Sequence, residues 1–236
     1  IILGGIKALN RGMATFCEVD PRMYGAAYIP FNFGEEVALK FLRDAINNNF
    51  SVILIDTIAP KGCKAFTHPD YDVVWQEIQE SNITITLHVG ADSSWDPVPL
   101  SFYNNASSVP VHKVGDAPRD ALAYMGISYN AELFLASMIF DGVLERFPNL
   151  RIGVVELGAS WIISWMKQLD QSYRAFRRLQ DLSQVKQLPS EYVKKHIKIT
   201  PFPGEDIGWL LTSGAADLLM FASDYPHHEG TDDPIS

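Results

Sequence analysis

Short apolar runs that end in a polar residue constrain the fold of this chain more than any other feature of its sequence. The runs cover residues 51–56, 83–88, 151–156 and 218–223, and each ends in, or just before, an acid or a histidine. They are too short to form helices of their own and are rich in β-branched residues. The run over 51–56 is nearly continuous, which is typical of a strand covered on both faces in a parallel sheet. The pattern therefore predicts buried parallel strands that deliver polar groups to one edge.

Apolar residues at helical spacing separate these runs and predict repeated βα units. Two further strands are predicted over 24–30 and 196–200. The predicted helices cover residues 2–17, 34–47, 70–81, 130–147, 160–179, a short segment from residue 190, and 206–213. About six βα units fit either a doubly wound sheet or a barrel. No GxGxxG or GxxxxGK[ST] motif marks the nucleotide-binding turn of a doubly wound fold, so the sequence favours a (β/α)8 TIM barrel.

The composition favours one domain that binds a small molecule. The chain has 236 residues, of which 47% are hydrophobic, and residues 1–236 are predicted to form a single domain. A formal net charge of −9 and no evident Lys/Arg cluster argue against nucleic acid or an anionic membrane as partner. The two cysteines, Cys17 and Cys63, lack CxxC spacing, which fits a reducing, cytoplasmic setting. No apolar run approaches the roughly 20 residues of a membrane span.

The segment 89–126 shows no clear helical or strand period and is predicted to be a long loop. Long loops inside compact domains are commonly lids over a functional site. The segment carries Trp95, Phe102 and Tyr103. Together with Tyr225, these aromatic residues suggest an apolar or aromatic substrate, although surface or core packing explains each of them equally well.

The ends of three predicted strands supply candidate catalytic or metal-binding residues, namely His88, Glu156 and Asp224. Asp224 is either a turn or N-cap acid or a metal ligand that also accepts a proton from metal-bound water. His88 is either a hydrogen-bonded histidine or a polar group of the same site. Glu156 is paired either with an arginine or lysine or with a bound cation, because a buried carboxylate without a partner is unfavourable. A barrel gathers such strand ends on one face, which favours the functional interpretation.

Two histidines follow the last predicted strand. Adjacent residues of an extended segment point in opposite directions, so His227 and His228 cannot both face the same pocket. His227 is predicted to line the substrate pocket, together with Trp95 and Tyr225.

Five short motifs spread over the chain form a recognisable set. They are residues 221–227 (FASDYPH), 87–90 (LHVG), 147–152 (FPNLRI), 8–11 (ALNR) and 20–22 (DPR). Together they resemble the amidohydrolase-related family, in the branch that contains aminocarboxymuconate-semialdehyde decarboxylase and the resorcylate-type decarboxylases. The resemblance covers nearly the whole chain.

This resemblance implies a TIM barrel with a divalent metal, most often zinc, at its C-terminal mouth. His88 matches a histidine ligand of the family and Asp224 its final aspartate ligand. The family's His-x-His or acid-x-His pair is absent before Ile2, so we expect the first two barrel strands to be missing and the sequence to be truncated at both ends. Glu156 stands where the decarboxylases have a catalytic histidine.

Three functions are compatible with these residues. The first is a metal-dependent hydrolase, in which a metal-activated water attacks a small organic substrate, Asp224 receives its proton and Glu156 orients the water. The second is a non-oxidative decarboxylase of the same family, in which Glu156 delivers a proton to carbon. The third is a barrel homologue that binds a ligand or partner without turnover. Trp161 and Trp165 permit a homo-oligomer interface, although packing against the barrel explains them more simply.

Overall fold

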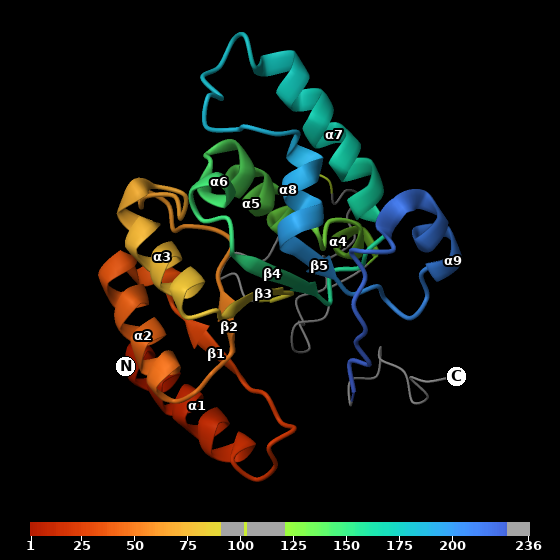
Figure 1. Cartoon of the computed structure of the whole chain (residues 1–236). Helices are drawn as coiled ribbons and strands as arrows, with labels where there is room; N and C mark the ends of the chain where they lie inside the picture. Colours follow the sequence, from red (N-terminus) through yellow and green to blue (C-terminus); the bar gives the residue numbers. More distant parts are fainter. Residues whose placement is uncertain (91–101, 103–120, 226–236) are drawn as a thin grey trace.

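A parallel sheet forms the centre of the fold (Figure 1), and the computed structural model describes residues 1–90, 102 and 121–225. The strands are β1 (Ala26–Ile29), β2 (Val52–Ile55), β3 (Thr84–His88), β4 (Arg151–Val155) and β5 (Ile197–Ile199), paired in this order and all parallel. Each strand lies beside the one that precedes it in sequence, without the reversal of strand order found in doubly wound sheets. This is the strand order of a (β/α)8 barrel, as predicted.

Helices precede, connect and follow the strands. They are α1 (Ile2–Cys17), α2 (Glu35–Asn47), α3 (Asp72–Glu80), α4 (Ala121–Met125), α5 (Tyr129–Phe140), α6 (Val143–Arg146), α7 (Trp161–Phe176), α8 (Pro189–His196) and α9 (Ile207–Leu210), with the short turns η1 (Phe31–Phe33), η2 (Pro69–Tyr71) and η4 (Leu211–Ala215). The helix predicted over 2–17 and the strands predicted over 51–56, 83–88 and 151–156 are confirmed to within one residue at each end.

The continuous helix predicted over 130–147 is wrong, because the chain breaks at Gly142. This residue has a left-handed φ of 72°, which ends α5 and starts α6 in a new direction. A Cβ atom at Gly142 would also lie 2.7 Å from the side chain of Gln184. Glycine is required here both for its backbone conformation and for this close approach. The break was not predicted from the sequence because apolar residues continue at helical spacing on both sides of it.

The last strand, predicted over 218–223, is reduced to a single parallel bridge between Leu219 and Ile199. Two hydrogen bonds form it, from Ile199 N to Leu218 O (2.8 Å) and from Met220 N to Ile199 O (2.9 Å). Because β5 has only three residues, it offers few backbone partners to a neighbouring strand. Phe221, expected to be buried in this strand, is 72% exposed. The segment nevertheless follows β5 in the predicted place.

One face of the sheet forms the hydrophobic core with the helices. Side chains aligned across all five strands on this face are buried: Ala27, Ile53, Ile85, Ile152 and Ile197. Helices α3, α5, α6 and α8 lie together on one side of the sheet (Figure 1). Burial of each large aliphatic side chain contributes about 1.5–3 kcal/mol. On the opposite face Leu54 and Thr86 are only half-buried, and this face leads to the polar strand ends.

The two tryptophans of α7 pack within the chain. Trp165 is 5% exposed, and its ring meets that of Trp161 edge to face with centroids 5.3 Å apart. The indole N–H of Trp161 donates to Gly158 O at 2.8 Å. Intramolecular packing therefore accounts for both residues, and a homo-oligomer stays a prediction.

The side chain of Asn10 pairs with the outer edge of β1. Its Nδ2 donates to Tyr28 O at 2.9 Å, and its Oδ1 accepts from Tyr28 N at 3.0 Å. The amide thus makes the two hydrogen bonds that a neighbouring strand would otherwise make with this residue. Helix α1 has no fully buried residue of its own, so this polar contact is an important part of its attachment to the sheet.

An aromatic cluster holds the loops that follow β1 and β2. Phe31 contacts Phe66, Tyr71 and Trp75, with ring centroids 5.1 to 5.6 Å apart. The hydroxyl of Tyr71 donates to Phe31 O at 3.0 Å, and the indole N–H of Trp75 donates to Phe66 O at 2.9 Å. Large buried aromatic rings with satisfied polar atoms make these loops rigid.

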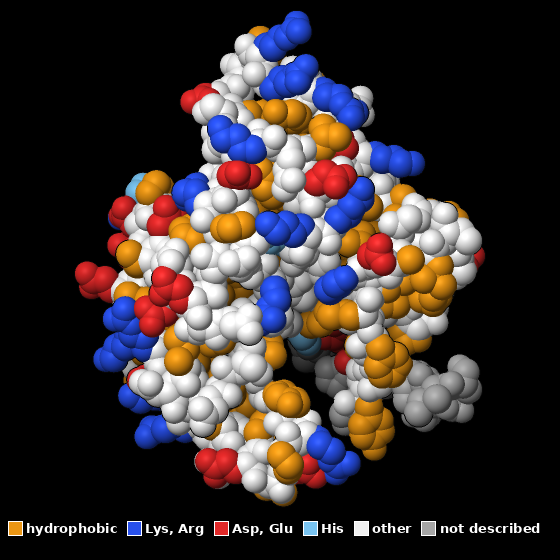
Figure 2. All heavy atoms as spheres, viewed as in Figure 1, with side chains coloured by type: hydrophobic (Ala, Val, Ile, Leu, Met, Phe, Trp, Pro, Cys, Tyr) orange, Lys and Arg blue, Asp and Glu red, His pale blue; other side chains and the backbone are white. Residues whose placement is uncertain are grey.

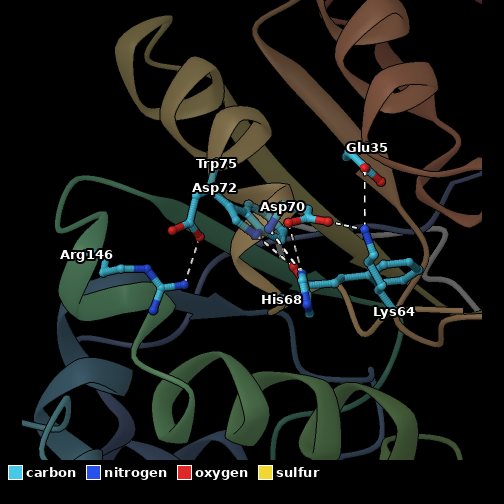
Figure 3. Close-up of polar contacts among 8 residues, drawn as sticks. Glu35, Lys64, His68, Asp70, Asp72, Trp75 and Arg146 are labelled. Atoms are coloured by element: carbon cyan, nitrogen blue, oxygen red, sulfur yellow. Dashed lines mark hydrogen bonds and ion pairs between the residues drawn. The ribbon is translucent and has the colours of Figure 1, made fainter.

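Ion pairs add a polar layer around the same loop (Figure 3). Lys64 lies between Asp70, which it contacts closely, and Glu35 at 3.8 Å. On the other side of the loop, Arg146 on α6 binds Asp72 at the start of α3 at 2.8 Å. Exposed pairs of this kind contribute only about 0–1 kcal/mol each. The aromatic cluster therefore dominates the stability of the loop.

Lys and Arg side chains lie over the end of α7 and over α8, with some acids among them (Figure 2). The exposed basic residues at the ends of these two helices include Arg174, Arg177, Arg178, Lys194 and Lys195. None of the helices in the described ranges is long and apolar enough to cross a membrane.

His196 is a buried histidine at the end of α8. It is 3% exposed, and its Nδ1 lies 2.7 Å from Leu150 O. Among the described residues its Nε2 has no hydrogen-bond partner. Burial, and to a smaller extent the charge of Lys195, lower the pKa of His196, and they outweigh the hydrogen bond to Leu150, which raises it. The folded protein therefore favours neutral His196.

We predict that Asn10→Leu lowers the free energy of unfolding by about 1–3 kcal/mol, because it leaves the N–H and C=O of Tyr28 without their partner. Arg11→Leu, at the neighbouring exposed position of α1, is the control and should change stability by less than about 0.5 kcal/mol. Urea unfolding followed by circular dichroism measures both. Equal effects of the two variants would contradict the role assigned to Asn10.

We predict that His196 makes the protein less stable in mild acid. The pKa of His196 in the folded state lies below the unfolded value of about 6.5. The stabilisation that comes from neutral His196 is therefore complete above pH 6.5 and is lost as the pH falls towards the folded-state pKa. His196→Asn should reduce the slope of unfolding free energy against pH in this window by up to about 1.4 kcal/mol per pH unit. Urea unfolding at pH 5 to 7.5 measures the slope, and an unchanged slope would exclude this residue as its source.

Candidate functional site

Polar residues stand at the C-terminal end of successive strands. Asp56 follows β2, His88 ends β3, Glu156 follows β4 and Thr200 follows β5. Because the strands are parallel, all these ends lie on the same edge of the sheet. In barrels this edge is the mouth that carries the active site. We call this group of strand ends the mouth.

The structure brings two of the predicted residues, His88 and Glu156, into direct contact. His88 Nε2 lies 2.8 Å from Glu156 Oε2, and His88 Nδ1 lies 2.7 Å from Val89 O. The His88 side chain is 34% exposed and that of Glu156 is 10% exposed. Glu156 is therefore paired with a histidine rather than with the arginine or lysine considered from the sequence.

Both nitrogens of His88 take part in short contacts. A carbonyl oxygen can only accept, so Nδ1 must carry a proton to bind Val89 O. Nε2 approaches Glu156 Oε2 to 2.8 Å as an ion-pair contact, which is attractive when the imidazole is protonated. The pair therefore places a base and an acid side by side at the mouth.

Glu156 reaches His88 because its backbone is left-handed. Val155 is opposite His88 in the ladder, and strict alternation along β4 would turn the next side chain to the other face. Glu156 has a φ of 56°, which breaks this alternation, and its N–H donates to Thr200 Oγ1 at 3.2 Å. Such a conformation in a residue other than glycine costs about 1–2 kcal/mol. Strain of this kind is concentrated at functional sites.

Asp224 shares this backbone feature. Its φ is 53°, and it is half-buried five residues beyond the bridge at Leu219. Both predicted acids thus adopt the left-handed conformation just beyond the end of a strand or bridge. The assignment of Asp224 as a metal ligand stays a prediction.

The predicted substrate-binding residues are largely outside the described part of the chain. Trp95, Tyr103, His227 and His228 fall outside it, as does most of the predicted lid over 89–126. Phe102 and Tyr225 are described and are 70% and 78% exposed. Their predicted contact with substrate therefore remains untested.

Sequence reasoning missed Asp56 and Tyr28. Asp56 is 1% exposed, and its Oδ1 accepts from the hydroxyl of Tyr28 at 2.7 Å. In the ladder Leu54 pairs with Thr86, so Asp56 and His88, two residues further along each strand, share one face. Asp56 could have been predicted as a site residue from the sequence, because the run over 51–56 ends in an acid just as the run over 151–156 does.

A small pocket opens beside His88. It is lined by Thr57, His88, Val89, Ile127, Asn130, Ala131 and Leu157. Its walls come from the ends of β2, β3 and β4 and from the start of α5. The pocket is far smaller than a site for an aromatic acid, and it places apolar side chains next to His88.

The donor atoms of His88 and Glu156 fit part of a metal site. Zinc binds imidazole nitrogen and carboxylate oxygen at about 2.0–2.2 Å, so two ligands of one ion lie about 3.3 Å apart. A cation bound by His88 Nε2 would require the pair to separate slightly from 2.8 Å. No group of three or more His, Cys, Asp or Glu side chains suited to a metal occurs within residues 1–90, 102 and 121–225. A complete site thus needs ligands in addition to this pair.

Known structures share this fold. An amidohydrolase from Mycobacterium avium subsp. paratuberculosis superposes with a TM-score of 0.72 at 19% identity, over 89% of this chain and 51% of that one. 5-Carboxyvanillate decarboxylase from Sphingomonas paucimobilis superposes with a TM-score of 0.66 at 21% identity, over 92% of this chain and 61% of that one. The 5-carboxyvanillate decarboxylase of Novosphingobium aromaticivorans superposes with a TM-score of 0.71 at 18% identity, over 93% of this chain and 60% of that one. That structure was solved with manganese and 3-methoxy-4-hydroxy-5-nitrobenzoic acid.

These comparisons confirm the predicted barrel-type α/β fold, and this chain spans about half to three-fifths of the length of those proteins. No curated protein matches its sequence. The family model described as amidohydrolase, in contrast, matches residues 5–234, which is nearly the whole chain. The chain therefore belongs to the amidohydrolase family.

Proposed function

We propose that this chain carries part of the active site of a metal-dependent enzyme that removes the carboxyl group of a small aromatic acid. The observation that carries the proposal is the 2.8 Å contact between His88 Nε2 and Glu156 Oε2, which pairs an acid with a base at the mouth. Decarboxylation replaces a carboxyl group by a proton, so the reaction requires a side chain beside the substrate that can deliver a proton. Similar structures include decarboxylases of 5-carboxyvanillate and 2,6-dihydroxybenzoate, which supports this class of substrate.

In this proposal Glu156 is the proton donor. The bond between the ring carbon and the carboxylate breaks, CO2 leaves, and the electron pair remains on the ring carbon. That carbon takes the proton from the Glu156 carboxyl group, and the glutamate regains a proton from solvent. The 10% exposure of the Glu156 side chain keeps water from competing for the transfer. The hydrogen bond from Glu156 N to Thr200 Oγ1 holds the loop in place during the reaction.

His88 and Asp224 are the proposed metal ligands on this chain. A divalent ion held there would bind the substrate carboxylate and stabilise its negative charge. The hydrogen bond between Nδ1 and Val89 O orients the His88 ring so that Nε2 faces the mouth. Zinc is the first metal to test, and manganese the second, because manganese is bound in a similar structure.

Hydrolysis is the second candidate function. It is favoured by the acid at position 156, where the resemblance to the family's decarboxylases leads us to expect a histidine. A carboxylate at this place can orient and deprotonate an attacking water as readily as it can deliver a proton. A barrel that binds a ligand without turnover would show neither activity.

We predict that Glu156→Gln lowers the rate of CO2 release from 2,6-dihydroxybenzoate by about 10²–10⁴-fold, because the amide cannot donate an acidic proton. Glu132→Gln is the matched control on α5. Glu132 accepts from Ser128 Oγ at 2.6 Å, a contact that the amide can keep. A cleavable aryl ester is assayed in parallel. Ester hydrolysis by the wild type without CO2 release would favour the hydrolase.

We predict that His88→Ala and Asp224→Ala each lower the metal content, from about one ion per chain to well below half of that. Asp217→Ala is the control, since Asp217 is an exposed acid on the same segment. Mass spectrometry of the purified, folded proteins measures zinc and manganese. Metal content that does not change in His88→Ala and Asp224→Ala would contradict the ligand assignment.

A further inference from the structure

The carboxylate of Glu205 ties together two loops that follow neighbouring strands. One loop joins β4 to α7, and the other joins β5 to α9. Glu205, on the second loop, accepts hydrogen bonds from the N–H groups of Ala159 (2.8 Å to Oε2) and Ser160 (2.6 Å to Oε1) on the first. Its Oε2 also accepts from Phe202 N at 2.7 Å, within its own loop. One side chain therefore fixes the position of one loop relative to the other.

The loop that Glu205 holds begins with the strained residue Glu156. Glu156 has a φ of 56°, and Gly158, two residues later, has a φ of 67°. A segment with two left-handed residues so close together follows neither a strand nor a helix. Strained backbone of this kind persists only where the surrounding structure holds it. Contacts from other segments must therefore maintain the shape of this loop.

Three contacts with the loop after β5 supply this support. At the first residue, Glu156 N donates to Thr200 Oγ1 at 3.2 Å. In the middle, a Cβ atom at Gly158 would lie 3.0 Å from the ring of Phe202, so glycine permits the close approach of the two loops. At the far end are the hydrogen bonds to Glu205, which are shorter and have a carboxylate as acceptor. Hydrogen bonds to a carboxylate are stronger than those to a neutral group.

Glu205 differs from an ordinary helix cap in the distance over which it acts. Ser160 is the N-cap of α7, and within the described part of the chain its side chain makes no capping hydrogen bond. Glu205, 45 positions later, accepts from this end of the helix instead. The next residue, Asp206, is a local cap, because its Oδ1 accepts from Trp209 N at 2.8 Å in its own helix α9. Two adjacent acids therefore have separable tasks.

We propose that Glu205 is a positioning residue, which holds the loop from β4 to α7 so that Glu156 stays in contact with His88. This inference rests on the proposed function, in which Glu156 delivers the proton, and deepens it by naming the residue that keeps the donor in place. Ala159 is fully buried and lies three residues after Glu156, so a shift at Ala159 is transmitted to Glu156 through the backbone. Glu205 acts through Glu156 and does not touch the reacting atoms.

The structural test compares Glu205→Ala with Asp206→Ala, its matched control in the same loop. Crystal structures give the distance between His88 Nε2 and Glu156 Oε2, which is 2.8 Å in the wild type. We expect folded Glu205→Ala to lose this contact. Hydrogen exchange followed by mass spectrometry should become about tenfold faster or more over residues 157–160, because their N–H groups lose an acceptor. Asp206→Ala should keep the contact and the exchange rates of this loop, although its melting temperature falls.

The kinetic test separates positioning from a general effect on stability. We expect Glu205→Ala to lower kcat for CO2 release from 2,6-dihydroxybenzoate by about 10–100-fold and to change KM by less than about threefold, because a displaced donor slows proton transfer. In the Glu156→Gln background the same substitution should have no further effect, since Glu205 acts through Glu156. Asp206→Ala should leave kcat unchanged in both backgrounds.

A second variant keeps the test decisive if Glu205→Ala does not fold. Glu205→Gln has the same size and retains one acceptor oxygen, so it should cause a smaller loss of the same kind. Thermal unfolding shows which variants are folded. Failure of both variants to fold would assign Glu205 a purely structural role and overturn the inference.

The remaining outcomes distinguish this inference from the function on which it rests. A folded variant that keeps the contact between His88 and Glu156 and the wild-type exchange rates overturns the role of Glu205 and leaves the decarboxylase proposal standing. An equal loss of kcat with and without the Glu156 carboxyl group overturns that role as well. A wild type that releases no CO2 overturns the proposed function, and the crystal structures and exchange rates then decide whether Glu205 positions Glu156.

Discussion

The parallel register of the five strands is the constraint on which the rest of the structure depends. Each strand pairs with the next in sequence order, so residues at their C-terminal ends meet at one edge although they are more than 25 positions apart in the chain. Apolar side chains on the covered face anchor this register, because a slip by one residue would expose every one of them. The contact between His88 and Glu156 and the contact between Tyr28 and Asp56 are consequences of the same ladder.

Backbone strain at one residue changes the side-chain direction that the strand ladder alone would give. Glu156 would point away from His88 if β4 continued its alternation, and its left-handed backbone turns it back. The cost of about 1–2 kcal/mol is small compared with the burial energy of the strands that hold it. Asp224 has the same conformation, four residues beyond the last backbone hydrogen bond from its segment to Ile199. A rigid sheet thus supports a strained acid, Glu156, at its edge.

Much of the fold could be predicted from the sequence, because strands and helices follow from local apolar spacing. The break at Gly142 could not, since it depends on contact with Gln184 from a distant segment. The candidate residues His88 and Glu156 could be found from the ends of their strands, but not their contact with one another. That contact depends on strand order and on one dihedral angle. The partnership of Tyr28 with Asp56 likewise depends on register across two strands.

The charges at the mouth explain why a proton, a metal or a donor group is needed there. Asp56 and Glu156 bring two carboxyl groups to one edge, where the imidazole of His88 meets Glu156. Like charges in a poorly solvated site repel strongly, and each carboxylate must gain a donor or a cation. Asp56 gains the Tyr28 hydroxyl, and Glu156 gains the imidazole of His88. The same electrostatic requirement thus explains why each of these buried carboxyl groups lies against a polar partner.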